Sequence, residues 1–577
     1  MIKLRNTLKG ILYRILIIGL PLLMMSCKKE PNIVFIIADD MYPHMFNNIS
    51  DSTTGGSKPN LTPTLDRLIE EGVWLENMKV VSPLCTPSRY NVLTGNFASR
   101  ATNKASENTA KRNNGQRVIQ WNSFIVPGNE RTMGNYFQKL GYKTGFVGKN
   151  HVVESEAQIG GNNKPDLNAN LKDPKVQKAL RYRYSELQKD IKNCGFDYAD
   201  GLYHNNTNWS GVKTLNTHNM DWIAEKGIEF IEQNKETPFI LYFAATVPHG
   251  PTNPRQSWES DRRLTPLGRI KDVPNVLPKY EGELPDKHDS ILAEYPGLEA
   301  TIRSYESINK RLEDKGLKGS DKANLLWLDD SVNALLNKLE EAEVLDNTII
   351  VFFNDHGQEL KGTLYEGGIN SQAFIWKKGG FKVGNILETP VSNVDFLPTL
   401  LDLAGDKKNL DKFDGYSFKP ALEGKEYEGR TAMYHELGYA RAIVKDNLKY
   451  YTVRYPEWAM NLSYEKRLEM LNKQNSFKEK FGLPALEADP MAPFGQLVMV
   501  PGGELVEIPA YTTMPHYSDP DQFYDLNNDP KEMNNVYNDP KYADKIKALK
   551  EELRKKLEKL PGNYPIDQSI TNNTFKN

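Results

Sequence analysis

NIVFIIADD, residues 32–40, decides the fold, because an unbroken apolar run that ends in two carboxylates is typical of a parallel strand buried on both faces. Three further apolar runs, 144–147, 239–245 and 348–353, also end in polar residues: GKNH at 148–151, PHGP at 248–251 and NDHG at 354–357. Helical patterns at 131–140, 221–233 and 324–341 alternate with these runs. Since ligands bind at the carboxyl ends of parallel strands, we expect the polar residues to form one site.

The remaining patterns predict how the 577 residues are organised. We expect an α/β fold, with a large mixed, mostly parallel sheet flanked by helices in residues 28–424. A smaller C-terminal α+β domain, with an antiparallel sheet and a helix, is predicted for residues 425–577, with a long insertion at 455–519. Other long polar stretches, 99–129, 154–192 and 251–320, are predicted to be loops. Asp329-Asp330 is expected on a solvated helix face, because the apolar residues around it keep helical spacing.

The N-terminus predicts export. Four basic residues precede the apolar run 15–25, which is too short to span a bilayer, and Ser26-Cys27 closes it. Its end is similar to a bacterial lipoprotein processing box, so we expect residues 1–27 to be a lipoprotein signal peptide and Cys27 to be lipidated. The protein would then belong to the cell envelope, facing the periplasm or the cell surface, with the membrane reached only through that anchor. A plain cleaved signal and a soluble periplasmic protein are the alternative.

The net charge and the number of cysteines exclude some classes of function and structure. Lys and Arg number 73 against 75 Asp and Glu, a net charge of −2, so no overall field favours nucleic acid or anionic membranes. Local charges must hold any anionic substrate. The chain has 3 cysteines, which excludes a disulfide framework.

Cys85 opens the segment CTPSR, residues 85–89, which YNVLTG follows at 90–95. Pro87 suits an early helical position and Gly95 a helix end, so Cys85 is predicted beside unpaired backbone N–H groups. A thiol there, one turn from Arg89, could be an activated nucleophile. A buried structural cysteine explains these residues equally well.

Asp39 and Asp40 repel each other at the end of a buried strand and need a cation or a shared proton. With Asp355 and His356 they suit a hard divalent ion, and calcium is favoured over magnesium where most ligands are protein oxygens. The alternative is that these acids cap helices or turns.

The segment at 85–95 resembles the signature of the type I sulfatases, in the alkaline phosphatase superfamily. The family's other landmarks follow in order and extend the resemblance from about Asn32 to the chain's end: GKNH, PHGP, NDHG, KGTLYEGG at 361–368 and YDLNNDPKE at 524–532. Residues 28–424 would then be the sulfatase catalytic domain. The chain departs from the family pattern at Asn150, His356 and Asn370.

The resemblance implies a role for each site residue. A formylglycine-generating enzyme would oxidise Cys85 to formylglycine (3-oxoalanine), whose hydrate is the nucleophile. The metal would be bound by Asp39, Asp40, Asp355, His356 and an oxygen of the modified Cys85. The aldehyde hydrate and the sulfate oxygens would be held by Arg89, Lys149 and Lys361. His249 would give a proton to the leaving alcohol and His151 would take one. We expect His204, with Lys361, to bind substrate, whereas His44 and His218 stay open.

The expected reaction is hydrolysis of sulfate esters on a sulfated polysaccharide or oligosaccharide. The candidate stacking platforms for a sugar are Trp121, Trp209, Trp258 and Trp458. Two alternatives remain: a phosphodiester or phosphonate monoester hydrolase of the same superfamily, and a non-catalytic glycan-binding lipoprotein.

Overall fold

The computed structural model describes residues 30–49, 59–129, 131–155, 166–250, 257–427, 430–480, 485 and 487–568. The predicted signal peptide at 1–27 and the lipidation site Cys27 lie outside the described residues. Within these ranges, no helix is both long and apolar enough to cross a membrane.

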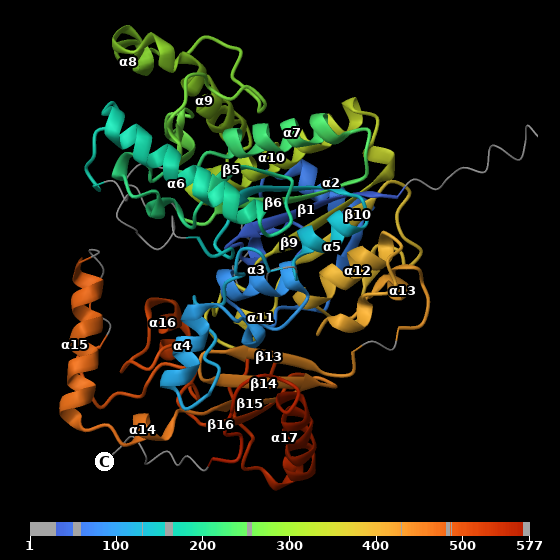
Figure 1. Cartoon of the computed structure of the whole chain (residues 1–577), viewed down its shortest axis with the longest axis vertical. Coiled ribbons are helices and arrows are strands. Elements are labelled where there is room, and N and C mark those ends of the chain that lie inside the picture. Colours follow the sequence, from blue (N-terminus) through green and yellow to red (C-terminus); the bar gives the residue numbers. More distant parts are fainter. Residues whose placement is uncertain are drawn as a thin grey trace, which may run out of the picture.

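A large sheet forms the centre of the molecule (Figure 1). Across the described residues it has eight strands, in the order β11-β2-β10-β9-β1-β6-β4-β5. The strands β9, β1, β6, β4 and β5 are parallel, whereas β10 is antiparallel to β9 and β2. The bounds are β1 Asn32–Asp39, β2 Val73–Leu75, β4 Lys143–Lys149, β5 Tyr198–Tyr203, β6 Phe239–Pro248, β9 Thr348–Asn354, β10 Ala373–Lys377 and β11 Ile386–Leu387. The four predicted strands are therefore neighbours at the sheet's centre.

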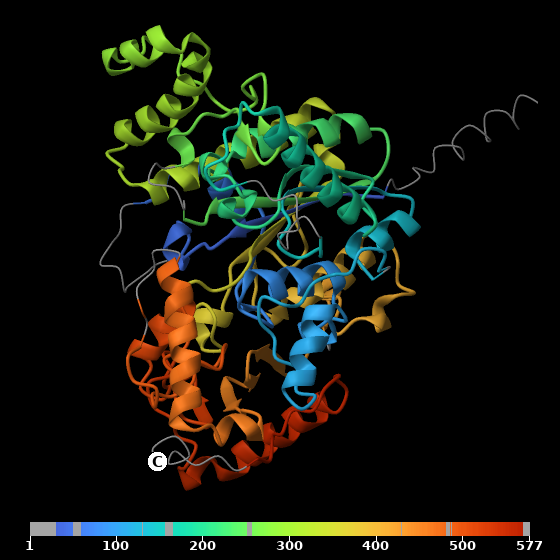
Figure 2. The same cartoon turned by 60° about the vertical axis from the view of Figure 1, so that its left-hand side comes forward.

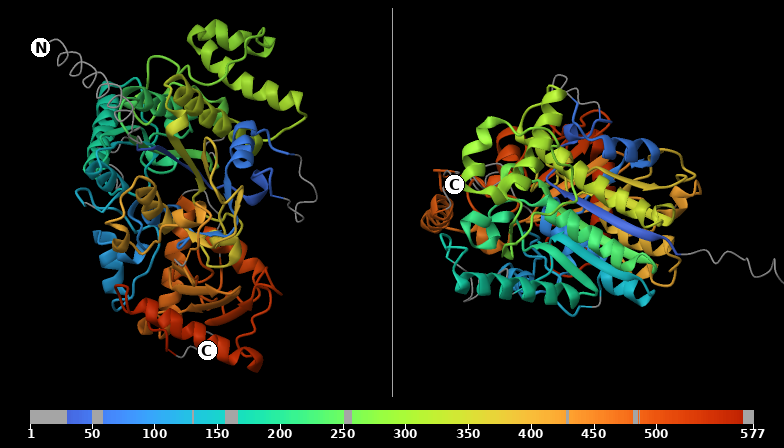
Figure 3. Two further views of the ribbon diagram at one scale, coloured as in Figure 1. Left: turned by 90° about the vertical axis from the view of Figure 1, so that its right-hand side faces the viewer. Right: turned by 90° about the horizontal axis from the view of Figure 1, so that it is seen from above.

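Helices cover both faces of this sheet (Figures 1 and 3). One face carries three helices that contact one another or the sheet: α2 Pro63–Glu71, α7 Met220–Asn234 and α10 Ser320–Glu341. The other face carries α3 Cys85–Thr94, α5 Met133–Lys139 and α12 Phe396–Leu403. The core strands β1, β6 and β9 are buried along their whole length, as their unbroken apolar runs predict.

A second, antiparallel sheet lies beyond the layer that contains α3 (Figures 1 and 2). Its order is β13 Met433–Leu437, β14 Ala440–Lys445, β15 Leu448–Val453 and β16 Asp521–Asp525, and α17 Ala543–Leu557 packs on β14 and β15. A separate core of apolar side chains, with Tyr434, Ile443 and Leu553 among its members, joins this sheet to α17. The α/β fold with a smaller α+β part is thus confirmed. The domain boundaries 28–424 and 425–577 stay predictions.

The prediction of a solvated face at Asp329-Asp330 was wrong. Asp329 is 1% exposed, and its carboxylate accepts hydrogen bonds from the backbone N–H groups of Thr64 (3.2 Å) and Leu65 (2.8 Å). Asp330 forms a bidentate ion pair with Arg311. The apolar spacing correctly predicted the helix α10, but α2 and α9 (Glu299–Asp314) cover the side that was expected to face water.

The long polar stretches were also predicted wrongly as loops, because they carry helices. The first contains α4 Lys104–Arg112, the second α6 Pro174–Lys192, and the third α8 Asp289–Glu294 and α9. The insertion at 455–519 contains α14 Glu457–Met460, α15 Tyr464–Lys480 and α16 Ile508–Thr513. Short apolar stripes amid many charges hid the helical period.

Candidate active site

The site lies at the carboxyl ends of four neighbouring strands. Asp39 is the last residue of β1 and pairs in register with Pro248 of β6, while Lys149 ends β4. Directly after β1, Asp40 turns the chain with a positive φ of 65°, and its N–H donates to Asp355 Oδ1 over 3.2 Å. The strand order β9-β1-β6-β4 thereby brings the predicted polar residues to one edge.

Cys85 begins α3 as the sequence predicts, and the helix ends at Gly95 with a left-handed φ of 65°. The thiol is buried, with Sγ 3.4 Å from His356 Nε2, 3.5 Å from Lys361 Nζ and 4.0 Å from Asp40 Oδ1. It therefore lies among the residues predicted to bind the metal and the substrate.

Ser88, for which the sequence predicted no role, fixes the first turn of α3. Its hydroxyl donates to the backbone oxygen of Asp355 over 2.5 Å and accepts from Asn393 Nδ2 over 2.9 Å. The bond ties the cysteine helix to the end of β9. The CTPSR motif contains this serine, but nothing in the local pattern shows the partner 267 positions away.

Four of the predicted metal ligands form one group. Ligand atoms of Asp40, Cys85, Asp355 and His356 all lie within 4.8 Å of one another. Burial is the main reason that the pKa of Asp355 is raised. Burial is also the largest single influence on the pKa of His356 and lowers it, but Asp355, Cys85 and Asp40 together raise that pKa, to about 10. Two carboxylates crowded beside a thiol and an imidazole are a donor set that a hard cation would fit.

Asp39 stands apart from this group. Its Oδ1 lies 3.2 Å from Arg89 Nη2 and its Oδ2 lies 2.5 Å from Lys149 Nζ, so both oxygens already have cationic partners. Burial raises the pKa of this carboxyl, but neighbouring cations, Lys149 first among them, lower it by more, and its net pKa lies below the usual range. The metal-ligand role of Asp39 stays a prediction.

The three predicted cations surround the carboxylates. Besides Asp39, Arg89 reaches Asp355 Oδ2 (3.4 Å), and Lys361 Nζ lies 2.6 Å from Asp40 Oδ1. Lys149 also donates to Asn206 Oδ1 over 2.6 Å. Asn206, which follows β5, was missed because the sequence showed no apolar run for that strand. Three carboxylates face three cations, so these charges balance. A bound metal cation would add positive charge and make the site attractive to an anion.

The two predicted proton-transfer histidines differ in environment. His249 is partly exposed, and its Nε2 lies 3.4 Å from Asp40 Oδ2. His151 is 5% exposed, has a left-handed φ of 50°, and stacks in parallel on Trp121 with the ring centroids 6.0 Å apart. Burial, then Lys149 and Arg89, hold the pKa of His151 well below its usual value. The imidazole of His151 is therefore neutral near pH 7, and its role as proton acceptor stays a prediction.

Trp121 is the predicted stacking residue that reaches the site. Besides His151, it has Lys361 Nζ 5.9 Å from its ring centroid. Trp258 is buried, whereas Trp209 and Trp458 are each 40% exposed. The structure therefore separates one tryptophan at the site from two at the surface.

The remaining predicted histidines are placed as follows. His204 is buried next to the site, where its backbone oxygen accepts from His151 N over 3.1 Å, and burial lowers its pKa to about 3. His218 is also buried, and its pKa is lowered to about 3 by burial and then by His249. His44 stacks on Tyr42. A substrate contact by His204 stays a prediction.

The second sheet holds the segment that carries Lys361. Tyr451 of β15 accepts from Leu364 N over 3.3 Å, and Tyr365 donates to Gln522 of β16 over 2.9 Å. Lys449, fully buried on β15, lies 3.1 Å from Glu366 and 2.7 Å from Glu532. The sequence predicted none of these contacts. The small C-terminal sheet is therefore part of the support of the active site.

Comparisons with known proteins agree with this architecture. The Sulfatase family model matches residues 31–406, and the C-terminal model of N-sulphoglucosamine sulphohydrolase matches residues 503–559. The chain therefore belongs to the sulfatase family, a class of sulfuric ester hydrolases.

Three similar proteins show how much of the chain is shared. An arylsulfatase of Clostridium perfringens is 25% identical over 480 residues, covering 78% of this chain and 92% of the relative. An N-acetylglucosamine-6-O-sulfatase of Bacteroides thetaiotaomicron is 25% identical over 612 residues, covering 94% and 88%. Among solved structures, BT4656 in complex with its substrate D-glucosamine-2-N,6-O-disulfate has a TM-score of 0.51 and 21% identity, covering 92% of this chain and 98% of that one. The last comparison shows a shared fold.

Proposed function

We propose that this protein hydrolyses sulfate esters of a sulfated saccharide, with formylglycine made from Cys85 and a bound Ca²⁺. The observation that carries the proposal is the position of Cys85. Its Sγ lies 3.4 Å from His356 and 3.5 Å from Lys361, at the head of a helix and inside a group of potential metal ligands. A structural cysteine would need none of these neighbours.

The cation would be held by Asp40, Asp355, His356 and residue 85, with Asp39 as a further candidate. The carboxylate oxygens among these ligands favour Ca²⁺, and Mg²⁺ is the less suitable ion because it retains more of its water. The hydrate of formylglycine supplies a hydroxyl nucleophile, and the cation supplies positive charge beside it. A formylglycine-generating enzyme is the partner that this chemistry requires.

The three basic side chains of the active site would bind the sulfate group. Arg89, Lys149 and Lys361 are buried, so their donors act where water does not screen them. They would neutralise the sulfate oxygens and orient the sulfur for attack in line with the departing alcohol. Each is also paired with Asp39 or Asp40, which fixes its direction before substrate arrives.

His249 and His151 would move the protons. His249 Nε2 is partly exposed beside Asp40, a place from which it can donate to the oxygen of the leaving alcohol. His151 is neutral and buried, and it would accept the proton of the remaining hydroxyl of residue 85, which releases the sulfate.

A sugar is the leaving group that we propose. Trp121 offers an aromatic surface next to Lys361 and His151, which suits the apolar face of a sugar ring. The relative from Bacteroides thetaiotaomicron is named as an N-acetylglucosamine-6-O-sulfatase, which supports a sulfated amino sugar as one candidate.

We also propose that the protein is a lipoprotein of the bacterial cell envelope, cleaved before Cys27. The basic start, the short apolar run and Ser26-Cys27 support this location. Mass spectrometry of the mature N-terminus would find a diacylated Cys27. An unmodified N-terminus at or beyond residue 27, in soluble protein, would instead support a plain cleaved signal.

Sulfate release from defined substrates tests the reaction. Sulfated mono- and oligosaccharides should release inorganic sulfate, and the matched phosphate esters and phosphonate monoesters should react at least about a hundredfold more slowly. Faster turnover of the phosphorus substrates would replace the proposal with the related hydrolase activity. Binding of sulfated saccharides without any turnover would support the non-catalytic alternative.

A further inference from the structure

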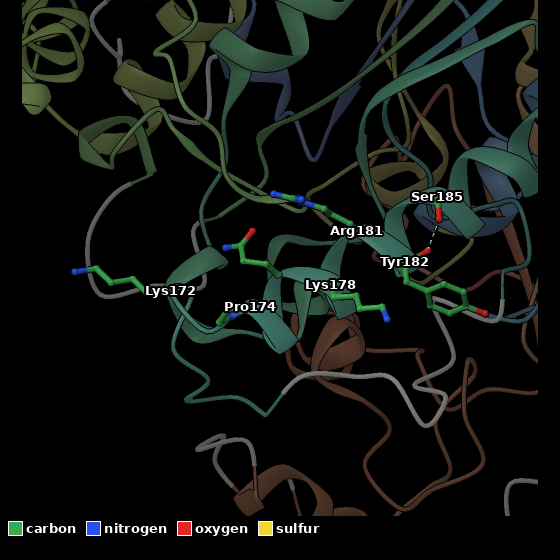
Figure 4. Close-up of a pocket in the computed structure, with 7 residues that line it drawn as sticks. Lys172, Pro174, Lys178, Arg181, Tyr182 and Ser185 are labelled. Carbon is green, nitrogen blue, oxygen red and sulfur yellow. Dashed lines mark hydrogen bonds between the residues drawn. The ribbon is translucent and has the colours of Figure 1, made fainter.

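The helix α6 presents a basic face to solvent (Figure 4). Its apolar side chains face inward, where Leu180, Leu187 and Ile191 are buried. On the outward side Lys178, Tyr182 and Ser185 follow one another at helical spacing, flanked by Lys175 and Arg181, and all five are exposed. Together with Lys172, Pro174 and Gln177, residues of this face line an open hollow of about 660 Å³.

The cations of this face lack acidic partners. Within the described residues, no carboxylate lies within ion-pair distance of Lys172, Lys175, Lys178 or Arg181, whereas Lys189 on the next turns lies 3.5 Å from Glu186. The helix N-cap Asp173 is the acidic side chain in this stretch, and it accepts the N–H of Lys175. Lys175, Lys178 and Arg181 lie on the first half of α6, and Lys172 lies just before it. They create a local positive potential that attracts a polyanion.

The basic half of α6 lies toward the same edge of the sheet as the active site. Gln188 Nε2 donates to the oxygen of Ala199 near the start of β5, whereas Tyr184 accepts from Leu202 N near its end. Farther toward the helix start, Leu180 packs with Val212 and Leu215, which come after β5. The helix therefore runs antiparallel to the strand, and Lys178 and Lys172 lie beyond the strand's carboxyl end.

Trp209 connects this helix to the active site along the chain. Asn206, which bonds to Lys149, precedes the short helical turn Thr207–Ser210 that carries Trp209. The oxygen of Ser210, one residue on, accepts a hydrogen bond from Arg183 of α6 over 2.9 Å. Trp209 is 40% exposed and Tyr182 is 50% exposed, so both aromatic rings are open to a ligand.

We propose that this face, defined by Lys175, Lys178, Arg181 and Tyr182 with Trp209, binds further sulfated sugars of a glycan that already has one of its sulfate groups in the active site. This inference rests on the proposed function. Sulfate groups would pair with the cations, and sugar rings would stack on the two aromatic side chains. The protein would then act on sulfated oligosaccharides and polymers with a lower KM than on monosaccharides.

A charge-reversed variant, K178E/R181E, tests the face. Its dissociation constant for dextran sulfate should rise about tenfold, since two exposed ion pairs are lost and reversed, and added salt should narrow the difference from wild type. Turnover of a sulfated monosaccharide should change less than about twofold. W209A should weaken dextran sulfate binding without altering its dependence on salt.

The variant K545E/K547E is the matched control, because both lysines are exposed on α17 of the other sheet and the change in charge is the same. It should bind dextran sulfate like wild type, and neutral dextran should bind to none of the proteins. Equal binding of dextran sulfate by wild type and K178E/R181E would overturn the inference, as would an equal loss in both variants. Wild type that binds dextran sulfate through α6 but releases sulfate from no ester would support this inference while contradicting the proposed function.

Discussion

Lys361 Nζ lies 2.6 Å from Asp40 Oδ1, although 321 positions separate the two residues in the sequence. The same ammonium group lies 3.5 Å from Cys85 Sγ. The segment containing Lys361 is thus fixed between a carboxylate of the potential metal group and the residue proposed as nucleophile. The second sheet supports this arrangement through Tyr451, Gln522 and Glu532.

We predict that Lys361→Met lowers kcat for sulfate release by about 10²–10³-fold, because one charge donor to the developing transition state is removed. Lys378→Met is the control, since its exposed ion pair with Asp346 lies on the surface, and it should keep wild-type kcat. A kcat of Lys361→Met within about threefold of wild type would contradict a role in catalysis.

We predict that Ca²⁺ stabilises the wild-type protein by about 2.7 kcal/mol at a hundredfold excess over its dissociation constant, because a ligand of the folded state stabilises that state. Asp355→Asn, which keeps the shape and part of the hydrogen bonding of this carboxylate, should lose the stabilisation and the sulfatase activity. Thermal unfolding with and without Ca²⁺ measures the effect. The exposed Asp346→Asn should respond to Ca²⁺ like wild type, and an equal response by Asp355→Asn would disprove the proposed ligand.

We predict that Lys449→Met lowers the free energy of unfolding by about 3–5 kcal/mol, because it leaves Glu532 as a buried carboxylate without a cationic partner, whereas Glu366 keeps its ion pair with Lys79. Urea unfolding measures the loss. Lys445→Met on the adjacent strand breaks a half-buried pair with Glu552 and should cost less than about 1 kcal/mol. Equal costs for the two variants would mean that the buried cluster does not support the segment that carries Lys361.

We predict that Asp329 makes stability fall as pH rises from about 4 to about 7. Burial raises the pKa of this carboxyl to about 7 from its ordinary value of 3.8, although the N–H groups of Leu65 and Thr64 oppose the change. Between these values the folded state holds a proton that the unfolded state has lost, so unfolding becomes easier as pH rises.

Thermal unfolding of Asp329→Asn between pH 4 and pH 7.5 tests that sign. The variant should lose less stability over this range than wild type, by on the order of 2 kcal/mol. Asp321→Asn, an exposed change on the same helix, should keep the wild-type dependence on pH. If the stability of wild type instead rises through this range, and Asp329→Asn shows the same dependence on pH, the carboxyl of Asp329 is ionised throughout.

Local patterns were sufficient for the four central strands of the large sheet. Continuous apolar runs predicted β1, β4, β6 and β9, because these strands are buried on both faces and leave no room for polar residues. The strand β5, Tyr198–Tyr203, was not predicted, since it contains Asp200 and Gly201 and lies at the edge of the sheet. Asn206 was missed with it.

The motifs predicted which residues gather at the site, because strand ends in a parallel sheet meet at one edge. They could not predict contacts between distant parts of the chain. The bonds from Ser88 to Asp355 and from Lys449 to Glu532, and the burial of Asp329, depend on packing between elements that carries no local period. The expectation of a loop was wrong at α6 for a different reason. This helix does have a local apolar period, but the apolar stripe is narrow and many charged residues mask it.

The mass of the tryptic peptide that contains Cys85, from protein that actively releases sulfate, shows whether residue 85 of the active enzyme is formylglycine. We predict the mass of formylglycine at position 85 in the active fraction, with activity in proportion to the modified share. Fully active protein whose Cys85 is an unmodified cysteine would contradict this prediction.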